Sequence, residues 1–387
     1  MKNLFKRFMV SASVLFISTT LMANTQSAIT PTEPPINATA YILMDAGSGE
    51  ILASKNMDDR APPASLTKLM TLFIISQALT DGKIKLDDKV RISKKAWKMT
   101  GSKMFVKVND EVLVSDLIQG IVVDSGNDAS VAMAEYIAGS EESFVDLMNA
   151  QAAALGMTNT HFTDATGFTE PDHYSSARDL AILARTIATE YPEEYKWYAQ
   201  KWFTYRDIKQ SNRNRLLWRY QYADGLKTGH TDAAKYCLVA SAVKEDMRLI
   251  VVILGAPSDE IRAEDSQKLF TYGFRFFKTV KLFNANTPIT TARVYFGEKS
   301  TITVGLKHPF YVTVADGLQD RVKTSFIVDK LKYAPIAKGD TLGEITATLG
   351  DKTLSTLPLI SLEATNQGSL WTSATDYVII AWHKWIA

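Results

Sequence analysis

The chain has 387 residues but a single cysteine, Cys237, and only five histidines. One cysteine excludes an intramolecular disulfide, so we expect cores that are stable by packing, with Cys237 as a small buried residue. The histidines form no H-E-x-x-H or other metal-ligand spacing, which argues against a metallopeptidase. We expect no metal and no cofactor. The 43 basic and 42 acidic side chains nearly cancel, so nucleic acid is not an expected partner.

The N-terminus has the layout of an export signal. A basic stretch with Lys2, Lys6 and Arg7 precedes an apolar segment over residues 8–17, and small residues follow up to Ala23. This order is typical of a secretory signal peptide at residues 1–23 that is removed, and a retained signal anchor is the alternative. We therefore expect the mature protein to act outside the cytoplasm.

Three short motifs occur in one order along the chain: S-x-x-K at Ser65–Lys68, S-x-N at Ser125–Asn127 and K-T-G at Lys227–Gly229. This set is typical of active-site serine enzymes of the penicillin-binding and β-lactamase group. Each motif alone is weak, because S-x-x-K recurs at Ser241–Lys244 and S-x-N at Ser54–Asn56. The assignment therefore depends on the order of the three motifs and on the segments in which they lie.

The context of the two S-x-x-K motifs differs. Ser65 follows a proline-bearing loop and opens an apolar run, which predicts a helix over residues 65–79. Residues i and i+3 share a helix face, so the Ser65 hydroxyl and the Lys68 amine can touch. Ser241 lies in an expected strand over residues 236–243, where i and i+3 point to opposite faces.

The predicted role of Ser65 is nucleophile, and a serine hydroxyl needs a base near neutral pH. Lys68 is the candidate base. Its pKa must fall by about three units from that of an ordinary lysine, through burial and a nearby cation such as Lys227. We expect Ser125 to pass a proton between Lys68 and the leaving amine, and Asn127 to hold the substrate amide.

The K-T-G motif has the character of an edge strand. The missing side chain of Gly229 would let a substrate backbone approach. Standing alone, Lys227 would be a solvated strand lysine, but its place in the ordered set favours a substrate-binding role.

The apolar patterns predict an α/β fold with a largely antiparallel sheet, in which strands come first and last and helices lie between them. We place this domain at residues 30–282. The expected strands are 40–44, 51–54, 236–243 and 247–254, with another at Lys227, and the expected helices are 65–79, 114–122, 129–138, 141–155, 176–189 and 262–279.

Composition changes near Phe283. From there the chain is rich in Val, Thr and Gly in short alternating runs, such as residues 292–296, 301–304 and 310–314. These runs predict a small all-β domain at residues 283–366.

The last segment, residues 367–387, is different again. From Leu370 onward, Trp371, Trp382 and Trp385 fall on one arc of a helix, whereas polar residues such as Asp376 fall on the other. The apolar run is too short to span a bilayer, so we expect an amphipathic helix in the membrane interface. A terminal helix docked on the protein itself is the alternative.

In its three motifs and in residues 212–218, 224–231 and 272–277, the chain resembles the low-molecular-mass penicillin-binding proteins that are D-alanyl-D-alanine carboxypeptidases of the type-5/type-6 subgroup, serine peptidase family S11. The resemblance runs from Ala40 to the terminal helix. It implies a penicillin-binding protein/serine β-lactamase-like catalytic domain, a β-rich second domain and a C-terminal anchor at the periplasmic face of the inner membrane.

The resemblance also implies a reaction. Ser65 would be acylated by the penultimate D-alanine of a peptidoglycan stem pentapeptide, the terminal D-alanine would leave, and water would release the shortened peptide, thereby controlling cross-linking and cell shape. The implied oxyanion hole is the backbone N–H groups of Ser65 and His230. Thr228 and Arg262 match contacts to the substrate's terminal carboxylate.

Two departures from class A β-lactamases bear on β-lactam antibiotics. The second motif has Gly126 where those enzymes have aspartate, and no E-x-x-x-N stands between it and Lys227. The glutamate used there for rapid deacylation is not evident, so we expect β-lactams to inhibit the protein. A D,D-endopeptidase or weak β-lactamase on the same site remains an alternative, as does a non-catalytic wall-binding protein.

Overall fold

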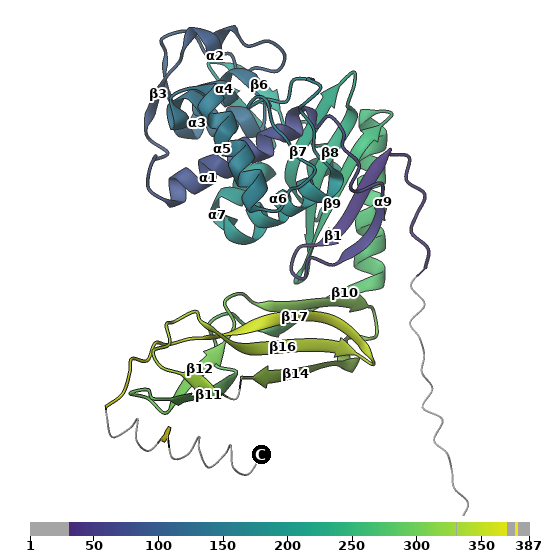
Figure 1. The fold of residues 1–387 in the computed structure, drawn as a ribbon. Helices are drawn as coiled ribbons and strands as arrows, with labels where there is room; N and C mark the ends of the chain where they lie inside the picture. The colour runs from purple at the N-terminus through teal and green to yellow at the C-terminus, as the bar shows by residue number, and fades with distance from the viewer. Residues whose placement is uncertain (1–30, 330, 370–375, 378–387) are drawn as a thin grey trace, which may run out of the picture.

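The computed structural model describes residues 31–329, 331–369 and 376–377. They form an α/β domain and an all-β domain, joined where helix α9 (Asp259–Phe276) runs directly into strand β10 (Phe277–Phe283) (Figure 1). The expected signal peptide and nearly all of the expected terminal helix lie outside the described residues. Within the described ranges, no helix is both long and apolar enough to cross a membrane.

The first domain is built on a five-stranded antiparallel sheet in the order β2-β1-β9-β8-β7, so the predicted α/β architecture is confirmed and β7 is an edge strand. Neighbouring residues of the central strands, such as Ile250 and Val251, face opposite sides of the sheet, and both are fully buried. The strands are β1 (Ala40–Asp45), β2 (Ile51–Lys55), β7 (Ala223–Thr231), β8 (Lys235–Lys244) and β9 (Met247–Ala256).

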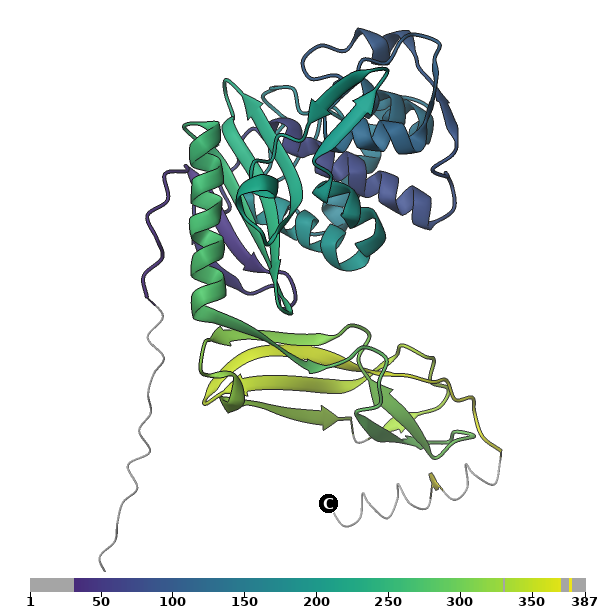
Figure 2. The same cartoon turned by 180° about the vertical axis from the view of Figure 1, so that it is seen from behind.

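Helices cover both faces of this sheet. α9 lies along one face (Figure 2), where Leu269 and Phe270 join the core that contains Leu43 and Val251. Helices from residues 64–199 cover the other face. They are η1 (Ala64–Thr67), α1 (Lys68–Thr80), α2 (Lys94–Lys98), α3 (Val114–Val122), α4 (Asn127–Ala138), α5 (Glu141–Ala154), α6 (Ala177–Glu190), α7 (Pro192–Tyr195) and η2 (Lys196–Ala199). The short helix α8 (Leu216–Arg219) lies on the α9 side, where Leu216 joins the same core as Leu269.

The ends of α9 differ from the prediction of 262–279. The Ser258 hydroxyl accepts a hydrogen bond from Ile261 N, and this cap starts the helix at Asp259. The helix stops at Phe276 because Phe277 already has extended backbone geometry. Two short antiparallel pairs, β3 (Lys89–Arg91) with β4 (Glu111–Leu113) and β5 (Trp202–Tyr205) with β6 (Ile208–Ser211), were not predicted.

The second domain is all-β, as expected. Its sheets have the orders β10-β13 and β14-β16-β17-β12-β11-β15, and Val304, Phe310 and Leu359 lie in its core. Because β10 pairs with β13, this domain starts before the compositional change at Phe283. The other elements are β11 (Thr290–Tyr295), β12 (Thr301–Gly305), β13 (Phe310–Ala315), η3 (Gln319–Arg321), β14 (Val322–Val328), β15 (Lys332–Tyr333), β16 (Thr341–Leu349) and β17 (Lys352–Ser361).

Candidate active site

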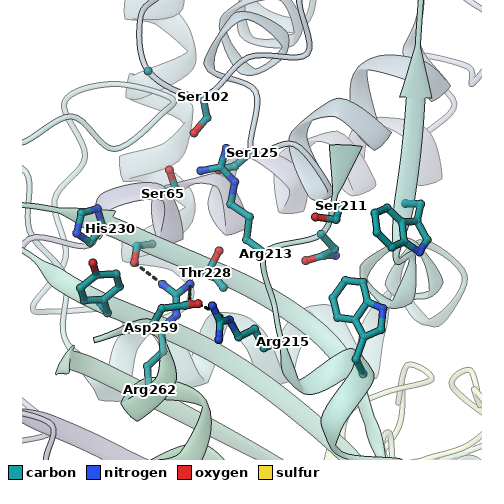
Figure 3. A pocket seen from close by; sticks show the side chains of 16 residues that line it. Ser65, Ser102, Ser125, Ser211, Arg213, Arg215, Thr228, His230, Asp259 and Arg262 are labelled. Atoms are coloured by element: carbon teal, nitrogen blue, oxygen red, sulfur yellow. Dashed lines mark hydrogen bonds and ion pairs between the residues drawn. The ribbon is translucent and has the colours of Figure 1, made fainter. Parts of the chain in front are cut away.

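The three motifs meet at one cleft of about 830 Å³ in the first domain (Figure 3). The predicted site residues that line it are Ser65, Ser125, Thr228, Gly229, His230 and Arg262. The other three, Lys68, Asn127 and Lys227, are buried and hydrogen-bonded to this group or to one another. The fold therefore brings all nine together, from η1 and α1, the start of α4, strand β7 and helix α9.

Ser65 lies in the 3-10 turn η1, immediately before α1. The first N–H groups of a helix have no partner within the helix, so this turn presents backbone donors beside the hydroxyl. Its neighbour Ala64 has a φ of +49°, a conformation that costs energy for a residue with a side chain. The nucleophile turn is thus held in shape by its surroundings.

The Lys68 amine is fully buried and makes three contacts. Nζ lies 2.7 Å from Asn127 Oδ1, 2.7 Å from the Thr166 carbonyl oxygen and 3.1 Å from Ser65 Oγ. Carbonyl oxygens only accept, so in the neutral amine the two N–H groups point at Asn127 and Thr166. The remaining lone pair then faces the Ser65 hydroxyl, which is the arrangement of a base and its nucleophile.

Burial is the main cause that lowers the pKa of Lys68 to about 7. The Asp164 carboxylate opposes this shift, the Arg213 guanidinium adds to it, and Asp128 again opposes it. The shift is the one that a base near neutral pH needs. Arg213 is the cation that lowers this pKa, and its side chain reaches toward Ser125 in Figure 3. The expected cation, Lys227, interacts with Lys68 through a lowering of its own pKa.

Lys227 is also buried, with 2% of its surface exposed. Its Nζ donates to Ser125 Oγ at 2.9 Å and to the Thr228 carbonyl at 3.0 Å. Burial, followed by the charges of Lys68, Arg213 and Arg262, holds the pKa of Lys227 well below its ordinary value. Lys227 is therefore not the solvated strand lysine that it would be outside the motif set, and its position beside Ser125 agrees with the expected place in the site.

The S-x-N motif turns sharply and is tied to its neighbours. Ser125 has a φ of +58°. Asn127 uses both ends of its amide within the protein, since Nδ2 donates to the Thr100 carbonyl at 2.7 Å while Oδ1 accepts from Lys68. The Asp128 carboxylate accepts from Met104 N at 3.0 Å, which fixes the segment that follows Gly101 and Ser102 on the cleft wall.

Gly229 and Arg262 shape the other wall. A Cβ added to Gly229 would stand 2.9 Å from the Pro63 carbonyl, so the missing side chain lets β7 pack against the nucleophile turn. Gly229 also lines the cleft, and the approach of a substrate backbone there stays a prediction. Arg262 Nη1 donates to the carbonyls of Gly229 at 3.1 Å and Cys237 at 3.2 Å, and its other nitrogen pairs with Asp259.

The sequence analysis missed several residues that contribute to this site: Arg213, Asp128, Asp164 and Thr166. Arg213 stands within residues 212–218, which carried the family resemblance, and that was the available signal. Asp128 follows the S-x-N motif directly. Thr166 acts through its backbone carbonyl, which leaves no mark in a sequence.

Comparisons with known proteins agree with this geometry. Residues 27–258 match the D-alanyl-D-alanine carboxypeptidase family of peptidases, and residues 277–367 match the C-terminal domain of penicillin-binding protein 5. The D-alanyl-D-alanine carboxypeptidase DacC of Escherichia coli is 44% identical over 361 residues, which cover 91% of this chain and 90% of that protein.

Solved structures of penicillin-binding proteins are also similar to this chain. Penicillin-binding protein 5 of Haemophilus influenzae has a TM-score of 0.79 and 43% identity, with 87% of this chain and all of that chain covered. Penicillin-binding protein D2 of Listeria monocytogenes, in an ampicillin-bound form, has a TM-score of 0.58 and 30% identity, with 63% of this chain and all of that chain covered.

Proposed function

The chain belongs to the D-alanyl-D-alanine carboxypeptidase family, and from this membership we propose how its site residues perform the reaction. The protein is a serine carboxypeptidase that removes the terminal D-alanine from peptidoglycan stem pentapeptides. The observation that supports our assignment best is the contact set of Lys68, whose two carbonyl partners leave its lone pair for Ser65.

Acylation starts when neutral Lys68 takes the Ser65 proton as Oγ attacks the carbonyl carbon of the penultimate D-alanine. The oxyanion that forms is held by the backbone N–H groups of Ser65 and His230. Ser125, held by Lys227, delivers the proton from Lys68 to the leaving amine. The peptide C–N bond breaks, the terminal D-alanine leaves, and the ester on Ser65 remains.

Deacylation, the second half of the reaction, regenerates the free Ser65 hydroxyl. Lys68, again neutral, takes a proton from water as the water oxygen attacks the ester carbonyl. The proton then passes to Ser65 Oγ as the shortened peptide leaves.

Before acylation, the carboxylate of the substrate's terminal D-alanine lies, in this proposal, against Thr228 Oγ1 and Arg262. Arg213 makes the cleft more positive and so attracts this carboxylate.

We test the assignment by incubating the protein with a stem pentapeptide and measuring free D-alanine, beside Ser65→Ala. Release that depends on Ser65 is expected. No release would leave the non-catalytic wall-binding alternative. Equal or faster cleavage of a cross-linked dimer of stem peptides would favour the D,D-endopeptidase.

We propose that β-lactams acylate Ser65 and are released slowly. The Asp164 carboxylate accepts hydrogen bonds through Oδ1 from Thr166 N, Thr166 Oγ1 and Gly167 N at 2.6–2.7 Å. A carboxylate that accepts three such bonds is a poor base for water, which supports slow release. Intact-mass measurement after penicillin treatment should show a lasting adduct on Ser65, and rapid turnover would contradict this.

We also propose that the mature protein is exported and lies on the periplasmic face of the inner membrane through residues 370–387. Asp376 supports this orientation, because its carboxylate accepts from Arg293 Nη2 at 3.0 Å and from Phe296 N at 2.7 Å. Asp376 belongs to the polar arc of the predicted helix, so contact of that arc with the protein would leave the tryptophan arc for lipid. Removal of residues 370–387 should abolish sedimentation with membranes, and continued sedimentation would refute the anchor.

A further inference from the structure

A largely buried loop, residues 164–167, contacts the Lys68 amine. It supplies the Thr166 carbonyl, one of the two oxygens that direct the Lys68 lone pair at Ser65. We propose that Asp164 is a positioning residue for catalysis, which builds this loop, aims the Thr166 carbonyl at Lys68 and sets the charge that Lys68 experiences. The proposal rests on the role of Lys68 as the base.

Asp164 shapes the loop through one oxygen. Oδ1 accepts from Thr166 N at 2.6 Å, Thr166 Oγ1 at 2.7 Å and Gly167 N at 2.7 Å. These bonds fold residues 164–167 into a tight turn with Gly167 at a φ of +98°. The turn leaves the Thr166 carbonyl with one orientation, toward Lys68 Nζ.

The other oxygen connects the turn to the helix that carries Lys68. Asp164 Oδ2 lies 3.4 Å from Nδ1 of His173, a fully buried side chain, and the same nitrogen accepts from Thr163 N at 3.2 Å and is hydrogen-bonded to Thr163 Oγ1 at 3.0 Å. The opposite ring nitrogen, Nε2, is hydrogen-bonded at 2.8 Å to Thr67 Oγ1, and Thr67 directly precedes Lys68. Helix α1 holds the loop a second time through Thr71 Oγ1, which donates to the Ala165 carbonyl at 2.8 Å.

The loop thus acts on Lys68 through geometry and through charge. The charged groups around Lys68 are Asp164 on this loop, Asp128 on α4, Arg213 beside the cleft and the Lys227 amine on β7. His173 and Glu141, which accepts from Ala165 N at 3.1 Å, face the loop itself. Asp164 stabilises the protonated form of Lys68, so removal of its charge should make the free base available at lower pH.

Two variants separate these effects. Asp164→Asn keeps an oxygen that accepts from the turn but removes the charge, whereas Asp164→Ala removes both. For Asp164→Ala we expect kcat for D-alanine release, and the rate of penicillin acylation, to fall at least tenfold with KM within twofold of the wild type. For Asp164→Asn we expect a smaller loss and a shift of the acid limb of the kcat/KM profile to lower pH.

Asp340→Asn is the matched control, because Asp340 Oδ2 accepts from Ala337 N in an exposed turn of the second domain; its profile should coincide with that of the wild type. The proposal is overturned if the acid limb of Asp164→Asn stays in place or moves to higher pH, or if Asp164→Ala acts only through KM. Failure of wild-type Ser65 to be acylated would instead refute the proposed function. If Asp164→Ala does not fold, the Asp164→Asn profile decides alone.

Discussion

Lys227 Nζ donates to Ser125 Oγ across 2.9 Å, and both side chains are almost fully buried. The two residues come from different elements, the edge strand β7 and the turn before α4, and each sits in an unfavourable state. Ser125 has a positive φ, and burial disfavours the charged form of Lys227. Such strain at a functional site is expected when the arrangement serves the chemistry.

Lys227→Met should therefore reduce activity without reducing stability. Loss of the contact to Ser125 should slow penicillin acylation roughly 10²- to 10⁴-fold, the usual share of a proton-transfer group. The pKa of Lys227 is lowered by folding, so protonation favours the unfolded state, and the uncharged Met should leave the melting temperature at neutral pH equal or higher. Lys323→Met, on the exposed surface of β14, serves as the control. A lower melting temperature together with unchanged acylation would contradict this view.

Arg213→Gln should move the acid limb of the pH profile in the direction opposite to Asp164→Asn. Arg213 lowers the pKa of Lys68, so its removal raises that pKa, and the free base forms only at higher pH. Arg213 also attracts the anionic peptide to the cleft. We expect its removal to cost about 1.4 kcal/mol of this attraction, which corresponds to a roughly tenfold lower kcat/KM.

Arg215→Gln is the matched control for Arg213. Arg215 lines the same cleft but is paired with Asp259 and Glu260. A shared displacement of the acid limb in both variants would mean that the general charge of the cleft, and not Arg213, sets the behaviour of Lys68.

Gly167→Ala should disturb the nucleophile turn. A Cβ at Gly167 would stand 1.8 Å from the Ala64 carbonyl oxygen, and the φ of +98° is unfavourable for alanine. We expect the free energy of unfolding to fall by about 3 kcal/mol, and acylation to slow because Ser65 follows Ala64. Urea unfolding and the penicillin rate constant measure the two effects.

Gly139→Ala separates crowding from backbone strain. Gly139 also has a positive φ, of +82°, but a Cβ there meets no atom within 4 Å. It should cost only about 1 kcal/mol. Equal losses in the two variants would show that the Ala64 carbonyl does not matter.

The parts of the molecule that sequence patterns predicted are those with local causes. Helix α3 was predicted at its observed bounds, 114–122, because apolar spacing along a helix is set within a few turns. The i, i+3 spacing of Ser65 and Lys68 likewise determined their contact before any fold was known. The end of α9 was misplaced because aromatic residues continue from Phe276 to Phe277 with no breaking residue at the change from helix to strand.

The relationships that sequence patterns did not predict are contacts between residues far apart in the chain. The carbonyl of Thr166 reaches Lys68 across 98 residues of chain, and nothing in the composition of either segment marks the meeting. Arg213 influences two lysines from a third segment, and its identity as arginine alone does not distinguish it from the other surface arginines. Only the packing of the whole domain brings Thr166 and Arg213 close to these lysines.

Asp124 gives a last prediction, in which stability rather than activity responds to pH. Its side chain is almost fully buried directly before Ser125, and Oδ1 has no hydrogen-bond partner among the described residues. Burial, with a contribution from Asp128, raises the pKa of Asp124 to about 7, although Arg213 opposes the shift. An unfolded aspartate has a pKa of about 3.9, so between about pH 4 and pH 7 the folded state binds a proton that the unfolded state releases. The contribution of Asp124 to stability therefore decreases as the pH rises through this window.

Asp124→Asn cannot ionise and should remove this decrease. We expect the variant to be more stable than the wild type by roughly 1–3 kcal/mol at pH 8, with the difference shrinking toward pH 5, in urea unfolding at both pH values. Asp351→Asn, in the exposed turn between β16 and β17, should follow the wild type at each pH. Parallel pH dependences of Asp124→Asn and the wild type would mean that the Asp124 carboxyl is already ionised in the folded protein at pH 5, with its charge compensated by Arg213.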